Sequence, residues 1–143
     1  MAEKYLPIHG RDHNPGGADP IVGLLDGTLN VVINGNGAVV STGVKLDVVM
    51  DFACTIVGVT TLADQTGSIV VNIWKDVHAN FPPTVADKIT ASAPPTISAG
   101  TKAQDTTLTG WTTAISAGDV LRFNVDSCSS IRRATVALKL ERT

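Results

Sequence analysis

Residues 120–126 read VLRFNVD, and the next regular stretch, residues 134–141, reads ATVALKLE. In both stretches apolar and polar side chains alternate residue by residue, so that Leu121, Phe123 and Val125 share one face of the first. An alternation of period two is typical of a β-strand with one buried face. No stretch of ten residues shows the 3.6-residue period of a helix. The two stretches therefore predict an all-β fold.

Earlier parts of the chain follow the same pattern. Residues 68–77, SIVVNIWKDV, predict another strong strand, and residues 44–52 alternate clearly. Residues 28–33 and 38–41 flank the sequence NGNG, whose two Asn-Gly steps supply the positive φ of a tight turn, so we expect a hairpin there. The β-branched run 54–63 ends at DQTG, which we interpret as a turn.

The middle of the chain is less regular. Tandem prolines at 82–83 and 94–95 exclude a central strand between residues 81 and about 104. We expect a short helical turn near residues 84–88 and one irregular edge strand there. Residues 115–119, ISAGD, predict a turn. The whole pattern predicts a jelly-roll-like antiparallel β-sandwich of about seven or eight strands over residues 28–143.

Residues 1–27 differ from the rest. Residues 7–20 contain three prolines and three glycines and have no regular period. Each proline fixes its own φ and pushes the preceding residue to extended backbone, which opposes helix and sheet. We expect an extended N-terminal arm that becomes ordered against another molecule.

Composition limits the class of protein. A chain of 143 residues suits one domain, and only 17% of its residues are charged, against about 25% in typical soluble domains. The low charge favours a surface partly covered by partner subunits. A net charge of -2 opposes nucleic-acid binding. The sequence has no run of about 20 apolar residues, so we predict no membrane span. The first residues lack a signal-peptide pattern, so we expect synthesis in a cytosol.

Two regions resemble proteins of tailed bacteriophages. Residues 9–21, HGRDHNPGGADPI, resemble a His-x-x-x-His-x-Pro-Gly-Gly-(Ala/Ser)-Asp-Pro-Ile segment of phage structural and fibre proteins. The chain from about residue 63 onward resembles a β-sandwich module of phage minor structural proteins. The pieces that carry this second resemblance are LADQTGSIVVNIWK at 62–75, NFPPT at 80–84, LTGW at 108–111 and ISAGDVL at 115–121.

The resemblance implies a virion structural protein, trimeric in many such cases. Our leading hypothesis is a capsid decoration (cement) protein, a homotrimer whose arm clamps the major capsid protein or other virion proteins. The alternative is a tail-tip or fibre head that binds host surface glycans, for which Trp74 is the possible ligand-binding residue; core packing is the favoured role of Trp74 and of Trp111. The predicted docking residues of the arm are His9, Arg11, Asp12, His13, Asn14, Pro15, Asp19, Pro20 and Ile21.

Residues suited to chemistry are few. His9 and His13 could meet their copies on a trimer axis and bind a metal, but we favour a docking peptide, and we predict no metal or cofactor. His78 has no nucleophile motif beside it, and we expect it in a surface turn. The scattered aspartates adjoin Gly, Ser, Thr or Asn, where a carboxylate caps backbone amides. We therefore predict no catalytic residues and no enzyme activity.

Overall fold

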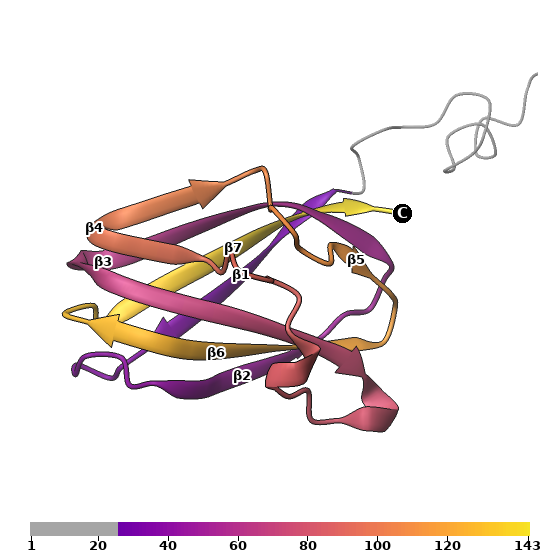
Figure 1. Ribbon diagram of the computed structural model, residues 1–143, viewed down its shortest axis with the longest axis horizontal. Coiled ribbons are helices and arrows are strands. Elements are labelled where there is room, and N and C mark those ends of the chain that lie inside the picture. The colour runs from indigo at the N-terminus through magenta and orange to yellow at the C-terminus, as the bar shows by residue number, and fades with distance from the viewer. Residues whose placement is uncertain (1–25) are drawn as a thin grey trace, which may run out of the picture.

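The structure is a computed structural model of the chain, and it describes residues 26–143. Seven strands in this range form an antiparallel sheet, in the order β1-β7-β3-β6-β2, with β4 and β5 also paired to β3 (Figure 1). The predicted all-β antiparallel fold is confirmed. Its elements are β1 (Gly27–Asn34), β2 (Gly43–Val49), β3 (Cys54–Val77), the 3-10 turns η1 (His78–Asn80) and η2 (Val85–Asp87), β4 (Thr96–Asp105), β5 (Ala114–Ile115), β6 (Asp119–Ser129) and β7 (Arg133–Arg142).

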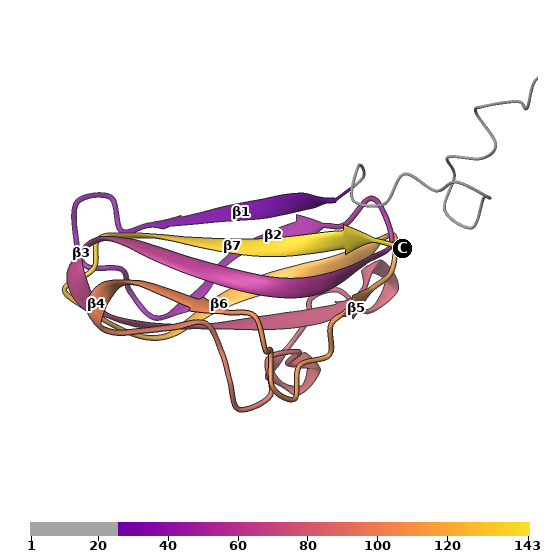
Figure 2. The same ribbon diagram turned by 90° about the horizontal axis from the view of Figure 1, so that it is seen from above.

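The 24-residue strand β3 joins two layers. Its first part, residues 54–63, pairs with β7, and its last part, residues 68–77, pairs with β6. β4 pairs with both parts and changes layer along with β3. The first layer therefore contains β1, β7 and the start of β3, and the second contains β2, β6 and the end of β3. Figure 2 shows the layers edge-on, and their curl makes one continuous sheet.

The turn predicted at residues 64–67 is present as a sharp bend inside β3, where the chain reverses between the two layers while the strand assignment continues (Figure 1). Asp64 Oδ1 accepts hydrogen bonds from the backbone N–H groups of Arg132 and Arg133, each at 3.1 Å. Gly67 is packed so closely that a Cβ there would lie 2.4 Å from the carbonyl oxygen of Ser129. The polar and glycine residues of this segment therefore allow a bend against the β6–β7 connection.

The hairpin predicted over residues 28–41 is wrong. The turn forms, with Asn36 at φ 55° and Gly37 at φ 90°, but residues 38–42 form no strand. β1 pairs instead with β7, from Gly27 opposite Leu140 to Asn34 opposite Arg133. The Asn-Gly steps set the local turn correctly, while the pairing partner of β1 lies a hundred residues later in the chain.

The proline-rich region has the expected form. β4 pairs with β3 alone, so it is an edge strand. η2 begins with a capping box, in which the Thr84 hydroxyl accepts from the Ala86 N–H and the Asp87 carboxylate accepts from the Thr84 N–H. This box fixes the short helical turn that the sequence predicts near residues 84–88.

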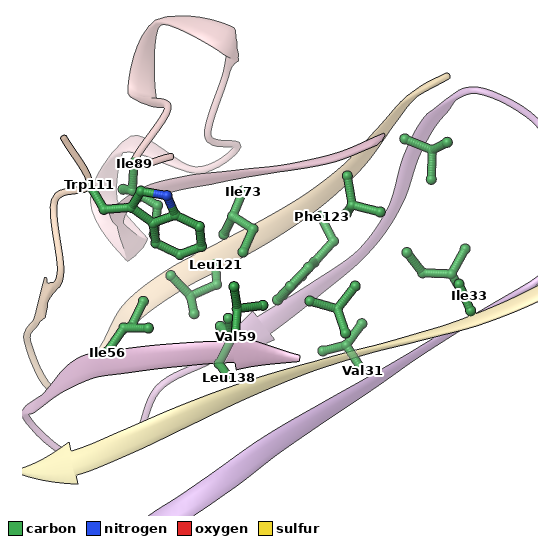
Figure 3. Packing of buried hydrophobic residues seen from close by; sticks show 14 of the residues in the cluster. Val31, Ile33, Ile56, Val59, Ile73, Ile89, Trp111, Leu121, Phe123 and Leu138 are labelled. Carbon is green, nitrogen blue, oxygen red and sulfur yellow. The ribbon is translucent and has the colours of Figure 1, made fainter. Parts of the chain in front are cut away.

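Apolar side chains from both layers fill one core. Figure 3 shows Ile89 and Trp111 beside each other at one end, with Phe123 near the middle and Val31 and Ile33 toward the other end. The indole Nε1 of Trp111 donates to the carbonyl of Ala93 at 2.8 Å, so its predicted core role is confirmed. The strand faces predicted to be inward are buried, as at residues 121, 123, 125, 134, 136, 138 and 140.

Candidate functional site

The predicted docking residues of the arm, His9 to Ile21, lie outside the described residues, and the structure places none of them. The candidate surfaces that the structure does describe are the outer faces of the two layers. Each face is built by the side chains that alternate with the core residues of the same strands. The second-layer face carries Trp74, and the first-layer face is formed by β1, β7, β3 and β4.

Trp74 lies on the outer face of the second layer and outside the apolar core. Its neighbours are Arg122 on β6 and Lys88, which forms an isolated bridge with it. The residue is half-buried, and its indole Nε1 is buried without a hydrogen-bond partner among the described residues. Trp74 thus differs from Trp111, and the core role favoured for it is wrong, since it lies beside the 78–90 connection and is half-buried.

Arg122 fastens the 78–90 connection over this face. Its Nε and Nη2 donate to both carboxylate oxygens of Asp47 on β2, at 2.7 and 2.8 Å. The hydrogen bond to Asp47 is the main cause that raises the pKa of the Arg122 guanidinium above its ordinary value. The guanidinium also lies 5.2 Å from the ring centroid of Phe81 and donates to the Pro83 carbonyl. Arg122 therefore links β2, β6 and the 78–90 connection.

The polar groups beside Trp74 bind one another. Asn72 is buried, and its amide donates to Asp126 Oδ2 at 2.6 Å while its oxygen accepts from the buried Thr90 hydroxyl. Asn124 donates to the other oxygen of Asp126 at 2.7 Å. This network connects β3, β6 and residue 90, and it satisfies buried polar atoms within the fold. A ligand at Trp74 would find these groups already engaged.

The aspartates mostly have the predicted capping roles. Asp105 Oδ1 accepts from the N–H groups of Thr107 and Leu108. Asp119 is buried, where it accepts from the Ser116 N–H at 2.8 Å and forms a salt bridge of 3.1 Å with Lys75. Such carboxylates are held by backbone amides and by a lysine, which is the pattern of a structural role. His78 is exposed at the start of η1, as predicted for a surface turn.

The first-layer face carries two exposed aliphatic side chains. Val32, Thr135 and Leu62 lie side by side on β1, β7 and β3, and Val32 and Leu62 are 56% and 47% exposed. The row on one side of them, Asn30, Ala137 and Thr60, is uncharged, while the row on the other side contains Arg133. We define the first-layer face as the first two of these rows together with their neighbours, namely Thr28, Asn30, Val32, Thr60, Leu62, Lys102, Gln104, Thr135, Ala137 and Lys139.

A hollow of about 370 Å³ lies at one end of this face. It forms where the pairing of β3 with β7 shifts register between Ile56 and Gly58. Gly58 contributes no side chain, and a Cβ there would meet only ordinary contacts, the nearest at 3.6 Å. The polar lining comes from three threonines, Gln104, Asp26 and Lys139, and Gly27, Val59 and Ala137 complete it. The hollow therefore offers hydroxyl and amide groups and one charge of each sign.

Sequence reasoning missed the first-layer face, although the sequence carries a signal for it. Val32 lies at a polar position of the alternating pattern of β1, and Leu62 lies at an exposed position of β3. An aliphatic residue on the solvent side of a strand is unremarkable alone. The pairing through β7 brings the two together, and this pairing could not be read from the local pattern.

Comparisons with protein-family models, curated proteins and solved structures find no significant match to the chain. Among residues 26–143 no group of three or more His, Cys, Asp or Glu side chains is placed to bind a metal ion. No helix in that range is long and apolar enough to cross a membrane.

Proposed function

We propose that this protein is a structural protein of a bacteriophage virion, a homotrimeric capsid decoration protein. The observation that carries the proposal is the first-layer face, where the exposed Val32 and Leu62 lie on either side of Thr135. Exposed apolar side chains grouped on one face mark a surface for contact with protein. The resemblance of residues 9–21 and of the chain after residue 63 to phage structural proteins supports the virion assignment.

The size of the face explains why the arm is needed. Four strands and about five residues span roughly 19 by 17 Å, or about 300 Å², at ordinary strand spacing. A specific interface buries about 800 Å² on each partner. The face alone therefore provides less than half of a stable contact. In the proposed protein the arm, with His9, Arg11 and His13, supplies the remainder by lying across a neighbouring capsid subunit.

The copy number of the protein in purified particles tests the virion assignment. Quantitative mass spectrometry against the major capsid protein should give hundreds of copies, as expected for a protein that covers the head. A handful of copies would move the protein to the tail or a fibre. Its absence from particles would refute the virion assignment.

Two variants test the interfaces. Deletion of residues 1–20 should abolish binding to particles that lack the protein, with the far-UV circular dichroism of the domain unchanged. Val32→Lys should weaken binding to the same particles, because it places a charge on the first-layer face. Val85→Lys is the matched control, since Val85 is 65% exposed on η2, in another part of the molecule. Unchanged particle binding by the Val32→Lys variant would contradict the role of this face.

Host-glycan binding is the second candidate, and the partial exposure of Trp74 favours it. An exposed indole face can stack on a sugar ring. Glycan-array binding that is lost in Trp74→Ala, with the thermal unfolding midpoint retained, would support this function. An array without signal for the unchanged protein would dismiss it.

A further inference from the structure

The curled sheet leaves an open seam between its two end strands. β1 pairs only with β7, and β2 pairs only with β6, so each has a second edge without a strand beside it among residues 26–143. A groove of about 230 Å³ lies at one end of this seam. Its apolar lining comes from β1, β2, the β2–β3 connection and β7, through Leu29, Val48, Met50, Phe52 and Leu140.

The groove exposes part of the interior. Met50 and Leu140 on its floor are buried, while Leu29, Val48 and Phe52 are only half-buried, and Val49 on its rim is 59% exposed. Sandwich cores normally bury such side chains, because each one left in contact with water forfeits part of its hydrophobic free energy. An apolar segment that covered the groove would therefore gain hydrophobic free energy.

The chain enters the described region at this groove. Asp26 Oδ1 accepts a hydrogen bond of 3.2 Å from the Arg142 N–H, which fixes the start of β1 beside the end of β7. The Arg142 guanidinium lies 4.6 Å from the ring centroid of Phe52, on the groove lining. The preceding five residues of the sequence, 21–25, read IVGLL and include four large aliphatic side chains.

We propose that residues 21–25 of the same chain cover the apolar groove between β1 and β2. Five extended residues reach about 17 Å, and the two layers of a sandwich lie about 10 Å apart, so the segment is long enough to cross from β1 to Val49. Direct attachment to β1 gives it an effective concentration on the order of millimolar. That value favours the chain's own segment over the same segment of another copy in dilute solution. The cover leaves residues 1–20 for partners.

Disulfide trapping in the full-length chain tests the cover. In a Cys128→Ser background, Ile21→Cys and Val49→Cys should form an intramolecular disulfide under mild oxidation. Cys54 is 1% exposed, and burial raises the pKa of its thiol, so it should not compete. Ile21→Cys with Val32→Cys is the matched control, because Val32 is exposed to a similar degree but lies outside the groove. Equal disulfide yields in the two variants, or disulfide-linked dimers, would overturn the proposal.

Thermal unfolding provides a second measurement. Leu24→Ser with Leu25→Ser should lower the unfolding midpoint by about 5 °C or more and increase the binding of a hydrophobic dye. Leu6→Ser with Ile8→Ser makes the same kind of change earlier in the chain and should leave the midpoint unchanged. An equal effect of both pairs, or of neither, would refute the cover. These measurements use the isolated protein, so they stand apart from the virion assignment.

Discussion

At the scale of single residues, Arg122 holds the 78–90 connection against the sheet through contacts of its charged side chain. The side chain binds both oxygens of Asp47 and lies against Phe81, and it is only 15% exposed, while Asp47 is 30% exposed. A bidentate arginine–carboxylate pair has well-defined geometry, but partial exposure to water weakens its contribution.

A double-mutant cycle should measure this contribution. Asp47→Ala and Arg122→Ala should show a coupling energy of about 0.5–1 kcal/mol in urea unfolding, smaller at 1 M salt because ions screen the pair. A cycle of Asp47→Ala with Lys102→Ala is the control and should show no coupling. A coupling energy that does not change with salt would indicate that packing on Phe81, and not charge, dominates.

The carboxyl group of Asp64 makes the free energy of unfolding depend on pH in the acid range. The hydrogen bond from the Arg133 N–H is the largest cause that lowers the pKa of the Asp64 carboxyl below its ordinary value of 3.8, and the Arg132 N–H adds to it. A carboxyl with a lower pKa in the folded state stabilises the fold fully above its unfolded pKa. This stabilisation is lost as the pH falls below about 3.8 through the folded pKa.

Asp64→Asn should therefore lower the free energy of unfolding at pH 7 and flatten its decline between pH 4 and pH 2. Urea unfolding at pH 7, 4 and 2.5 measures both effects. Asp51→Asn, an exposed aspartate in the β2–β3 connection, is the control. Parallel pH profiles of Asp64→Asn and the unchanged protein would show that the carboxylate does not stabilise the bend.

At the scale of elements, β3 depends on the absence of a side chain at Gly67. A Cβ there would lie 2.4 Å from the Ser129 oxygen and 2.8 Å from Ile131 Cγ1. Gly67→Ala should destabilise the protein by about 1–3 kcal/mol, because backbone and a buried isoleucine would have to move. Gly58→Ala, whose nearest contact is 3.6 Å, should change stability little. The urea midpoints at constant m-value measure both, and equal effects would contradict the close packing at the bend.

The elements also show how far the sequence can predict the fold. Residues 120–126 and 134–141 were assigned correctly, because each strand has one buried face and its alternation is local. The bend at residues 64–67 was interpreted as a turn, since DQTG has turn composition whether or not the strand continues. The pairing of β1 with β7 is long-range, and no local pattern specifies it. The position of Val32 near Leu62 depends on this pairing. The core role favoured for Trp74 is wrong, because the 78–90 connection covers this residue on the outer face, which is a tertiary effect.

At the scale of the whole molecule, one strand connects both layers, so neither layer should unfold alone. β3 supplies the neighbour of β7 in one layer and of β6 in the other. Far-UV circular dichroism and tryptophan fluorescence should therefore give coincident urea transitions. Gly67→Ala should shift both curves equally. Separate midpoints for the two signals would show that the layers are independent units.

The pairing of β1 with β7 also determines how the domain responds to force. Gly27 lies opposite Leu140 at the end where β1 starts and β7 stops, so both strands can be pulled from the same end (Figure 1). Tension between residues 27 and 142 would load one pair of residues at a time, so the hydrogen bonds between β1 and β7 would break one after another. Tension between residue 27 and the 130–132 turn would load the whole ladder in shear. A tether through the N-terminal arm therefore withstands most tension when the opposing attachment is at the far end of the domain.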